Sequence, residues 1–284
     1  MINMQPSNFR TFDLGLIGYP LDHSLSPQIH AAALKACGLQ GGYSLFPVRP
    51  DDLNGLRKML DRVCAGEICG LNVTIPHKQN VIPFLDELTP AARVIGAVNT
   101  IYLRDDKLMG DNTDAPGFLS DLKKFIANSN LEAGKSALVL GAGGSARAVV
   151  YTLINEGWKI TIAARRIEQA QDLAKQFKSA GTMEFDFPAF RPSNFPLIIN
   201  TTPLGMAPNA DQSPWPEGLP FPPRSAVYDL VYNPRRTKLV KDAWAAGSSA
   251  ATGLGMLIEQ AALSFETWTG FNPPRKALLD SIDH

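Results

Sequence analysis

A glycine-rich turn carries the clearest chemical signal in the sequence. It reads Gly141-Ala142-Gly143-Gly144-Ser145-Ala146, after the apolar run Ala137-Leu140 and before a stretch with apolar residues at helical spacing. Gly141, Gly143 and Ala146 fit the Gly-x-Gly-x-x-Gly/Ala pattern, in which glycines allow a tight turn and a helix N-terminus holds a pyrophosphate. A glycine turn can also be purely structural, but the strand–turn–helix context favours a dinucleotide site.

The end of the next predicted strand indicates which dinucleotide the site prefers. An NAD site usually carries Asp or Glu about 20 residues beyond the glycines, to bind the ribose 2′-hydroxyl. Here the strand ends in Ala164-Arg165-Arg166 and offers no carboxylate. Two guanidiniums suit a 2′-phosphate, although two solvated arginines are the simpler alternative. The pattern favours NADP(H).

Polar side chains gather where the predicted N-terminal strands end. The groups are Ser24-Leu25-Ser26-Pro27, Asn72-Val73-Thr74-Ile75-Pro76-His77-Lys78, Ala97-Val98-Asn99-Thr100 and Asp111-Asn112-Thr113-Asp114. Open α/β sheets bind ligands at the carboxyl ends of their strands. Hydroxyls, carboxamides, one cation and one anion suit a small polyhydroxylated carboxylate better than an apolar ligand.

Hydrophobic periodicity predicts the elements that position these residues. Strands are expected at 12–17, 43–48, 69–75, 137–140 and 159–163, an antiparallel pair at 98–103 and 107–109, and helices beginning near 26, 52, 116 and 254. The proline-rich stretch 203–224 is expected to be a long surface loop. The alternation of strands and helices predicts an α/β fold with a mainly parallel sheet in the N-terminal part and a Rossmann-type unit after residue 116.

Composition limits the classes of partner and location. The 284 residues contain 27 Lys and Arg and 27 Asp and Glu, so nothing in the net charge suggests a nucleic acid or membrane partner. Cys37, Cys64 and Cys69 have neither a metal nor a redox spacing, which favours thiols in a reducing compartment. Met1 to Arg10 lack the apolar core of a signal peptide, so we expect a cytoplasmic protein. We also expect a small-molecule substrate and a monomeric or homodimeric state.

The motifs taken together resemble the shikimate dehydrogenases. Besides the groups above, the resemblance rests on Gly96-Ala97-Val98-Asn99-Thr100, Asn200-Thr201-Thr202-Pro203-Leu204-Gly205-Met206, Tyr232-Asn233-Pro234, Gly253-Leu254-Gly255-Met256-Leu257 and Gln260. It implies reduction of 3-dehydroshikimate by NADPH to shikimate, in aromatic amino-acid biosynthesis. It also implies a discontinuous substrate domain, residues 1–115 and 254–284, around an NADP-binding Rossmann domain, residues 116–253.

The resemblance also implies roles for individual residues. Lys78 and Asp114 would be the catalytic pair, and no metal is needed. Ser24 and Ser26 would bind the substrate carboxylate. The ring and its hydroxyls would contact Asn72, Thr74, Asn99, Tyr232 and Gln260, besides Asp114. The cofactor would contact Gly141, Ala142, Gly143, Gly144, Ser145, Ala164, Arg165, Arg166, Thr202, Leu230 and Gly253.

Simpler structural roles compete with several of these assignments. Ser26, which precedes a proline, is also a good helix N-cap, and Asp114 would equally cap the helix expected at Pro116. Lys78 taken alone is compatible with a solvated surface lysine. Tyr232 is compatible with a buried tyrosine bonded to the backbone, and Gln260 with a hydrogen bond at the helix rim.

Two departures from the family pattern are visible. Ala164-Arg165-Arg166 stands where Asn-Arg-Thr is frequent, and Thr252 stands where an acidic residue is frequent. A dual-specificity quinate/shikimate dehydrogenase and a non-catalytic sensor of NADP(H) or a metabolite are the alternative functions. In the favoured mechanism, an ammonium at Lys78 stabilises the reacting oxygen and exchanges its proton, and Asp114 positions Lys78 and a hydroxyl.

Overall fold

Two sheets organise the chain. The computed structural model describes residues 11–129, 131, 134–178, 180–184 and 195–283. Within them the strands form two six-stranded sheets, each in its own compact unit. The first unit comprises Met1–Thr89, Val98–Asp111 and Ala261–His284, and the second comprises Pro90–Ala97 and Asn112–Gln260. This division returns to the first unit at Ala261, whereas the sequence suggested residue 254, and it assigns 90–97 to the second unit.

The first unit holds a mixed sheet in which parallel pairs outnumber antiparallel ones. Its strands are β1 (Thr11–Gly18), β2 (Gln40–Pro47), β3 (Gly70–Val73), β4 (Glu87–Leu88), β5 (Thr100–Arg104) and β6 (Lys107–Asp111). Their order is β2-β1-β3-β5-β6-β4, and only β3–β5 and β5–β6 are antiparallel among the described pairs. The β5–β6 turn places Asp105 and Asp106 at positive φ, as a two-residue hairpin requires. The predicted hairpin is thus confirmed.

Several helices pack against the apolar side chains of this sheet. They are α1 (Ser26–Ala36), α2 (Leu53–Cys64), the single turn α3 (His77–Asn80), a 3₁₀ turn (Ile82–Phe84), α10 (Arg275–Asp280) and the C-terminal part of α9 (Leu254–Thr269). Leu71 of β3, Leu56 of α2 and Phe265 of α9 are completely buried. Strand β3 stops at Val73, two residues before the predicted end, so Thr74 belongs to the loop that leads into α3.

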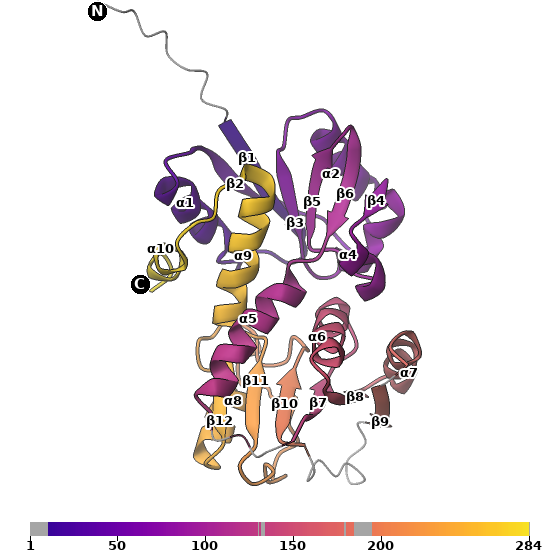
Figure 1. The fold of residues 1–284 in the computed structure, drawn as a ribbon, viewed down its shortest axis with the longest axis vertical. Helices are drawn as coiled ribbons and strands as arrows, with labels where there is room; N and C mark the ends of the chain where they lie inside the picture. The colour runs from indigo at the N-terminus through magenta and orange to yellow at the C-terminus, as the bar shows by residue number, and fades with distance from the viewer. Residues whose placement is uncertain (1–10, 130, 132–133, 179, 185–194, 284) are drawn as a thin grey trace, which may run out of the picture. The chain divides into compact units, whose positions relative to one another are not determined.

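The second unit contains a sheet whose described strands all run parallel. They are β7 (Ser136–Leu140), β8 (Lys159–Ala164), β9 (Ala180–Glu184), β10 (Leu197–Asn200), β11 (Ala226–Asp229) and β12 (Ser249–Thr252). Their order, β12-β11-β10-β7-β8-β9, is the Rossmann order with its topological switch point between β7 and β10 (Figure 1). The predicted Rossmann-type unit is confirmed.

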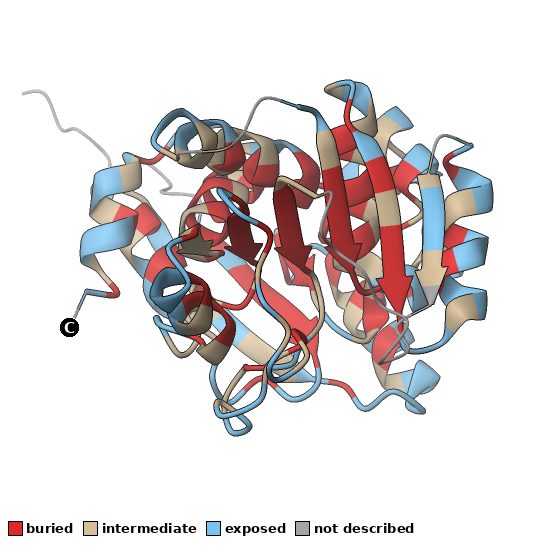
Figure 2. Cartoon of the chain, turned by 90° about the horizontal axis from the view of Figure 1, so that it is seen from below, coloured by how far each residue is buried: buried red, intermediate tan, exposed pale blue. Residues whose placement is uncertain are grey.

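Alternating residues of these strands face opposite layers. Val139 and Ile199 pack against α5 (Asp114–Ala127), α6 (Gly144–Asn155) and α7 (Ile167–Gln176), whereas Leu138 and Ile198 pack against α8 (Lys238–Ala245). The remaining helix, α4 (Pro90–Ile95), contributes Ile95 to a small cluster with α5 and α6. The central strands are accordingly buried along most of their length, and the outer helix faces are exposed (Figure 2).

The segment 203–224 contains neither helix nor strand, as predicted, but it is more than a surface loop. Trp215 is buried, stacks on Phe221 with ring centroids 4.7 Å apart, and donates from Nε1 to the carbonyl oxygen of Leu219 at 2.9 Å. Trp215 packs on the α8 face of the sheet together with Leu239. The indole of Trp215 therefore anchors to the sheet a segment that composition alone predicts to be exposed.

Candidate functional site

Strand pairing brings two of the predicted substrate residues together in the first unit. Thr74 follows β3 and donates its backbone N–H to Ile17 of β1 at 2.8 Å. Asn99 precedes β5, and because β5 runs antiparallel to β3, it lies beside the carboxyl end of β3. The N–H of Val73 donates to the Asn99 carbonyl oxygen at 2.9 Å. The side chains of both residues therefore come from the edge where ligands of such sheets bind.

Lys78 is fixed through its backbone beside Asn99. Its carbonyl oxygen accepts from the N–H of Val98 at 2.7 Å, and its side chain is half-buried. The preceding His77 is completely buried, and its Nε2 lies 2.7 Å from the carbonyl oxygen of Val48. His77 thus anchors the α3 turn.

Ser24 and Ser26 lie at the start of α1. The N-cap is Leu25, Ser26 is the first helical residue, and no side chain caps this end by a hydrogen bond. The alternative role of Ser26 as N-cap is therefore wrong, because Ser26 already lies inside the helix and Pro27 occupies its second position. Ser26 instead donates its N–H to the Ser24 hydroxyl at 3.3 Å. An anion at this end would also meet the positive end of the α1 dipole.

Asn72 holds the centre of a buried hydrogen-bond network. Its Nδ2 donates to the Asn99 carbonyl oxygen and to the Ser264 hydroxyl, both at 3.0 Å, while its Oδ1 accepts from the Tyr43 hydroxyl at 2.8 Å. The hydroxyl of Thr100 lies 2.9 Å from that of Ser264 and donates to Asn99 Oδ1 at 3.0 Å. The network fixes both the carbonyl group and the side chain of Asn99.

The glycine turn of the second unit has the geometry that a pyrophosphate site requires. Gly141 has φ +110°, and its N–H donates to the carbonyl oxygen of Ala163 at 2.8 Å. A Cβ built on the exposed Gly143, the N-cap of α6, would meet no described atom within 4 Å, which leaves room for a ligand. Ala146 is completely buried and lets α6 approach the sheet. Ala142, Gly144 and Ser145 complete the turn and remain half-buried.

Arg165 and Arg166 lie at the strand end next to this turn. Leu140 of β7 pairs with Ala163 of β8, and the two arginines follow Ala164 immediately. Both are exposed, and Arg166 occupies the N-cap position of α7. Ala164 is buried, so its methyl group packs inward where the frequent family residue is a carboxamide. The structure therefore places two available cations beside the glycine turn.

Thr202, Leu230 and Gly253 follow the next three strands of the same sheet. Thr202 donates both its N–H and its hydroxyl to Asn200 Oδ1, at 2.8 and 2.7 Å. The N–H of Leu230 donates to the Asn200 carbonyl oxygen at 2.9 Å. A Cβ on Gly253 would lie 2.4 Å from the Leu230 carbonyl oxygen, so only glycine permits this approach. The sheet thus brings together the predicted cofactor residues.

Asp114, Gln260 and Tyr232 also belong to the second unit. The N-cap of α5 is Thr113, and Asp114 lies buried in the first helical turn, so the alternative role of Asp114 as N-cap is wrong. Gln260 is half-buried and donates from Nε2 to the carbonyl oxygen of Leu257 at 2.9 Å. One turn after Asp114, a Cβ on Gly117 would lie 2.8 Å from the Gln260 backbone nitrogen, so α5 and α9 are in close contact there. Burial raises the pKa of Tyr232.

Each unit holds part of the predicted set of site residues. The first unit holds Ser24, Ser26, Asn72, Thr74, Lys78 and Asn99, and the second holds Asp114, Tyr232, Gln260 and the predicted cofactor residues. Sequence reasoning missed Tyr43, Ser264 and Asp229, which hydrogen-bond to predicted site residues or to the residues that support them. Of these three residues, only Asp229 could have been noticed in the sequence, because it is a carboxylate at the end of an apolar strand. Such a residue is rarely buried without partners.

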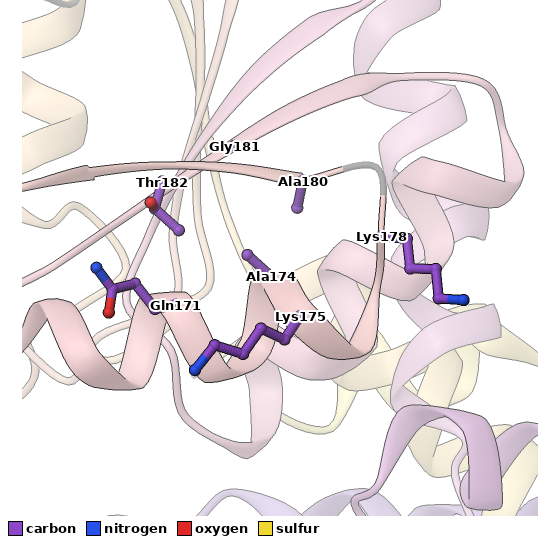
Figure 3. A pocket seen from close by; sticks show the side chains of 7 residues that line it. All are labelled: Gln171, Ala174, Lys175, Lys178, Ala180, Gly181 and Thr182. Carbon is purple, nitrogen blue, oxygen red and sulfur yellow. The ribbon is translucent and has the colours of Figure 1, made fainter.

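A shallow depression between α7 and β9 takes no part in this arrangement. It is lined by Gln171, Ala174, Lys175, Lys178, Ala180, Gly181 and Thr182 (Figure 3). None of these is a predicted site residue, and the ammonium of Lys175 is 3.1 Å from Asp172. The depression is therefore separate from the candidate site.

Across the described part of the chain, no helix combines the length and apolarity needed to cross a membrane.

Known proteins resemble both units. A family model described as the shikimate dehydrogenase substrate binding domain matches residues 16–101. A second, described as shikimate/quinate 5-dehydrogenase, matches residues 125–189, and a third, described as the shikimate 5′-dehydrogenase C-terminal domain, matches residues 253–282.

Similar proteins cover nearly the whole chain. The shikimate dehydrogenase (NADP(+)) of Salinibacter ruber is 42% identical over an alignment of 280 residues that covers 94% of this chain and 95% of the relative. The shikimate 5-dehydrogenase of Thermus thermophilus, solved with NADP(H) and shikimate, has a TM-score of 0.84 and 37% identity, with 95% and 98% of the two chains covered. The quinate dehydrogenase of Corynebacterium glutamicum, solved with NAD, has a TM-score of 0.83 and 30% identity, with 95% and 98% covered.

Proposed function

Because the chain belongs to the shikimate dehydrogenase family, we propose that it catalyses the reversible, NADPH-dependent reduction of 3-dehydroshikimate to shikimate. One observation carries the proposal. The family models fall on both units, with the substrate-binding model over 16–101 and the shikimate/quinate dehydrogenase model over 125–189. A protein that kept only dinucleotide binding would need the second match alone.

The second unit supplies the cofactor site. Gly141, Ala142, Gly143, Gly144 and Ser145 bind the pyrophosphate, since the turn is open at Gly143 and ends at the N-terminus of α6. Arg165 and Arg166 bind the 2′-phosphate, and Ala164, the last residue of β8, lines the same part of the site. Thr202, Leu230 and Gly253 contact the nicotinamide half, because they follow strands on the other side of the switch point.

The substrate contacts come from named residues of each unit. Ser24 and Ser26 bind the carboxylate, a role that the α1 N-terminus favours electrostatically. Thr74, Asn99, Tyr232 and Gln260 bind the ring hydroxyls. Asn72 contributes mainly through Asn99, since both hydrogens of its carboxamide already have protein acceptors.

Lys78 and Asp114 serve the reacting centre in this proposal. Bound NADPH supplies a hydride to the ring carbonyl carbon. The ammonium of Lys78 stabilises the negative charge that develops on the carbonyl oxygen and then donates its proton there. The Asp114 carboxylate accepts a hydrogen bond from a substrate hydroxyl and so fixes the ring. In the oxidative direction, the neutral amine of Lys78 takes the hydroxyl proton.

The same proposal includes a cytoplasmic location and a monomeric or homodimeric state. Cys37, Cys64 and Cys69 are free thiols, as is usual in a reducing compartment. Sedimentation velocity on the purified protein determines the oligomeric state, and a larger assembly would contradict this part of the proposal.

Initial rates test the activity directly. Oxidation of NADPH, followed by absorbance, should depend on 3-dehydroshikimate, and shikimate should reduce NADP in the reverse direction. The Lys78→Met variant controls for contaminating activity, because it keeps a long side chain without the ammonium. Cofactor binding without any turnover in the native chain would instead support a non-catalytic sensor.

A dual-specificity quinate/shikimate dehydrogenase is the second candidate. It is favoured by the similarity to the quinate dehydrogenase solved with NAD. The exposed Arg165 and Arg166 favour NADP over NAD in this chain. Rates with shikimate and quinate, each with NADP and NAD, separate the two candidates. A kcat/KM for quinate within a few-fold of that for shikimate would establish dual specificity.

A further inference from the structure

A buried carboxylate terminates one of the central strands of the second unit. Asp229 is the last residue of β11, it is 0% exposed, and it pairs in register with Asn200, the last residue of β10, which is also 0% exposed. Burying a charge is costly unless it is hydrogen-bonded. The Asp229 carboxylate therefore requires hydrogen-bond donors within the protein.

Three donors satisfy this carboxylate. Asn200 Nδ2 and the N–H of Val231 donate to Oδ1 at 2.8 and 3.0 Å, and the Thr237 hydroxyl donates to Oδ2 at 2.6 Å. All three donors are neutral groups. Burial raises the pKa of Asp229 to about 6, while the hydrogen bonds from Thr237, Val231 and Asn200 lower it. The group thus changes charge within an experimentally accessible pH range.

The charge determines how the Asn200 carboxamide is oriented. An ionised carboxylate only accepts hydrogen bonds, so it must face Nδ2 of Asn200. Oδ1 of Asn200 then faces Thr202, where it accepts from the N–H at 2.8 Å and from the hydroxyl at 2.7 Å. When the group at position 229 is neutral, it can also donate a hydrogen bond. The Asn200 carboxamide can then turn over, so that its Oδ1 faces residue 229 and its Nδ2 faces Thr202. Thr202 would then lose its acceptor.

The same carboxylate fixes the turn after β11. Val231 donates to it, and the preceding Leu230 donates its N–H to the Asn200 carbonyl oxygen at 2.9 Å. Through Thr237, which caps α8 by accepting from the N–H of Val240, the carboxylate also holds the start of that helix. Two loops that follow adjacent strands are therefore held by one side chain.

We propose that Asp229 is a positioning residue for the cofactor, holding Thr202 and Leu230 in place through Asn200 and Val231. This inference rests on the proposed function, since it was in that proposal that Thr202 and Leu230 were assigned to the nicotinamide half. Asp229 itself touches neither cofactor nor substrate in this proposal. Its effect should appear in cofactor binding and should depend on its charge.

The test is an equilibrium titration of NADP binding, by fluorescence, between pH 5 and 8. Asp229→Asn keeps the size and one acceptor oxygen but removes the charge. We expect its Kd for NADP at pH 8 to be about 10-fold higher than that of the native chain, as for the loss of one hydrogen bond to a charged group. Asp242→Asn is the matched control, because it removes a half-exposed carboxylate of the same unit, whose partner is the ammonium of Lys238.

The pH profile separates positioning from a general loss of stability. The native chain should lose affinity as pH falls through about 6, where Asp229 gains its proton. The 2′-phosphate titrates in the same range, so the readout is the difference between native and Asp229→Asn, which share that phosphate. The two curves should converge at pH 5. Parallel curves, or an unchanged Kd at pH 8, would overturn the proposal.

A second variant covers the case in which Asp229→Asn does not fold. Thr237→Val removes one donor from the ionised carboxylate, so the pH midpoint of NADP binding should move upward. An unchanged midpoint would contradict the proposal. These titrations need no turnover, so an inactive native chain that shows this pH behaviour would refute the proposed reaction without affecting the role of Asp229.

Discussion

In the proposed site, the cofactor preference depends on two exposed arginines, and replacing them is the most informative perturbation. Arg165 and Arg166 follow β8 directly, and the N–H of Gly141 in the neighbouring turn bonds to Ala163 at 2.8 Å. In the variants Arg165→Gln, Arg166→Gln and the double variant, the 2′-phosphate of NADP loses charged donors. NAD has no phosphate at this position and should be affected only through lost stacking on adenine.

The expected magnitude follows from the exposure of the two side chains. A hydrogen bond to a charged group contributes about 1.5–3 kcal/mol, and solvent screening at an exposed site reduces this to about 1–2 kcal/mol. Each single variant should therefore lower kcat/KM for NADP about 5- to 30-fold, at about 1.4 kcal/mol per factor of ten. The double variant should lower it about 100-fold, with a change of only about 2-fold for NAD.

The assay compares kcat/KM for shikimate oxidation with saturating shikimate and variable NADP or NAD. Lys175→Gln is the matched control, because it removes an exposed positive charge from α7, the helix that begins at Ile167. Raising the ionic strength should weaken NADP use by the native chain more than by the double variant. An equal loss with both cofactors, or no loss with either, would refute the assignment of the arginines to the 2′-phosphate.

Three further substitutions test the other parts of the site. Lys78→Ala should lower kcat about 10²- to 10⁴-fold, as for loss of a general acid, while the Kd for NADP in a titration stays within about 2-fold; normal turnover would exclude Lys78 from catalysis. Gly141→Ala should weaken NADP binding about 10-fold or more, because φ is +110° and the new Cβ would lie 2.6 Å from Thr201 Oγ1; an unchanged Kd would show that the turn relaxes freely. Tyr43→Phe leaves Oδ1 of the buried Asn72 without this donor, so urea unfolding should show a loss of about 1–2 kcal/mol, and KM should rise for the substrate but not for NADPH; a rise for NADPH alone would contradict the network.

The fold was predictable where local pattern and tertiary structure agree. Gly141 and Ala146 identified the β7–α6 turn because the glycine spacing is itself the structural requirement. The predicted hairpin formed as well, with Asp105 and Asp106 at the positive φ that a two-residue turn requires. The end of β3 was placed too late, because the apolar Ile75 continues the strand pattern although it lies exposed in the loop before α3.

The supporting residues of the site were less accessible to sequence reasoning. Tyr43 and Asn72 are 29 residues apart, and Asn72 and Ser264 are 192 apart, so no local period links them. Trp215 lies in a proline-rich stretch whose composition predicts an exposed loop, yet the Trp215 side chain is buried against the sheet. Contacts of this kind arise from strand order and helix packing, which a single sequence does not specify.

The bond between Asn72 and Ser264 has a consequence for how the protein is made. During synthesis, the segment that contains β1, β2 and β3 leaves the ribosome long before Ser264, 192 residues further along the chain. Until then, Asn72 lacks one of its acceptors, and Ile101 lacks the indole donor of Trp268, which bonds to its carbonyl oxygen at 3.0 Å. In the second unit the separations are shorter, since Lys124 bonds to Glu259, 135 residues further along, and the unit ends at Gln260. We therefore expect the second unit to complete its core first, and the nascent first unit to depend longest on protection from aggregation.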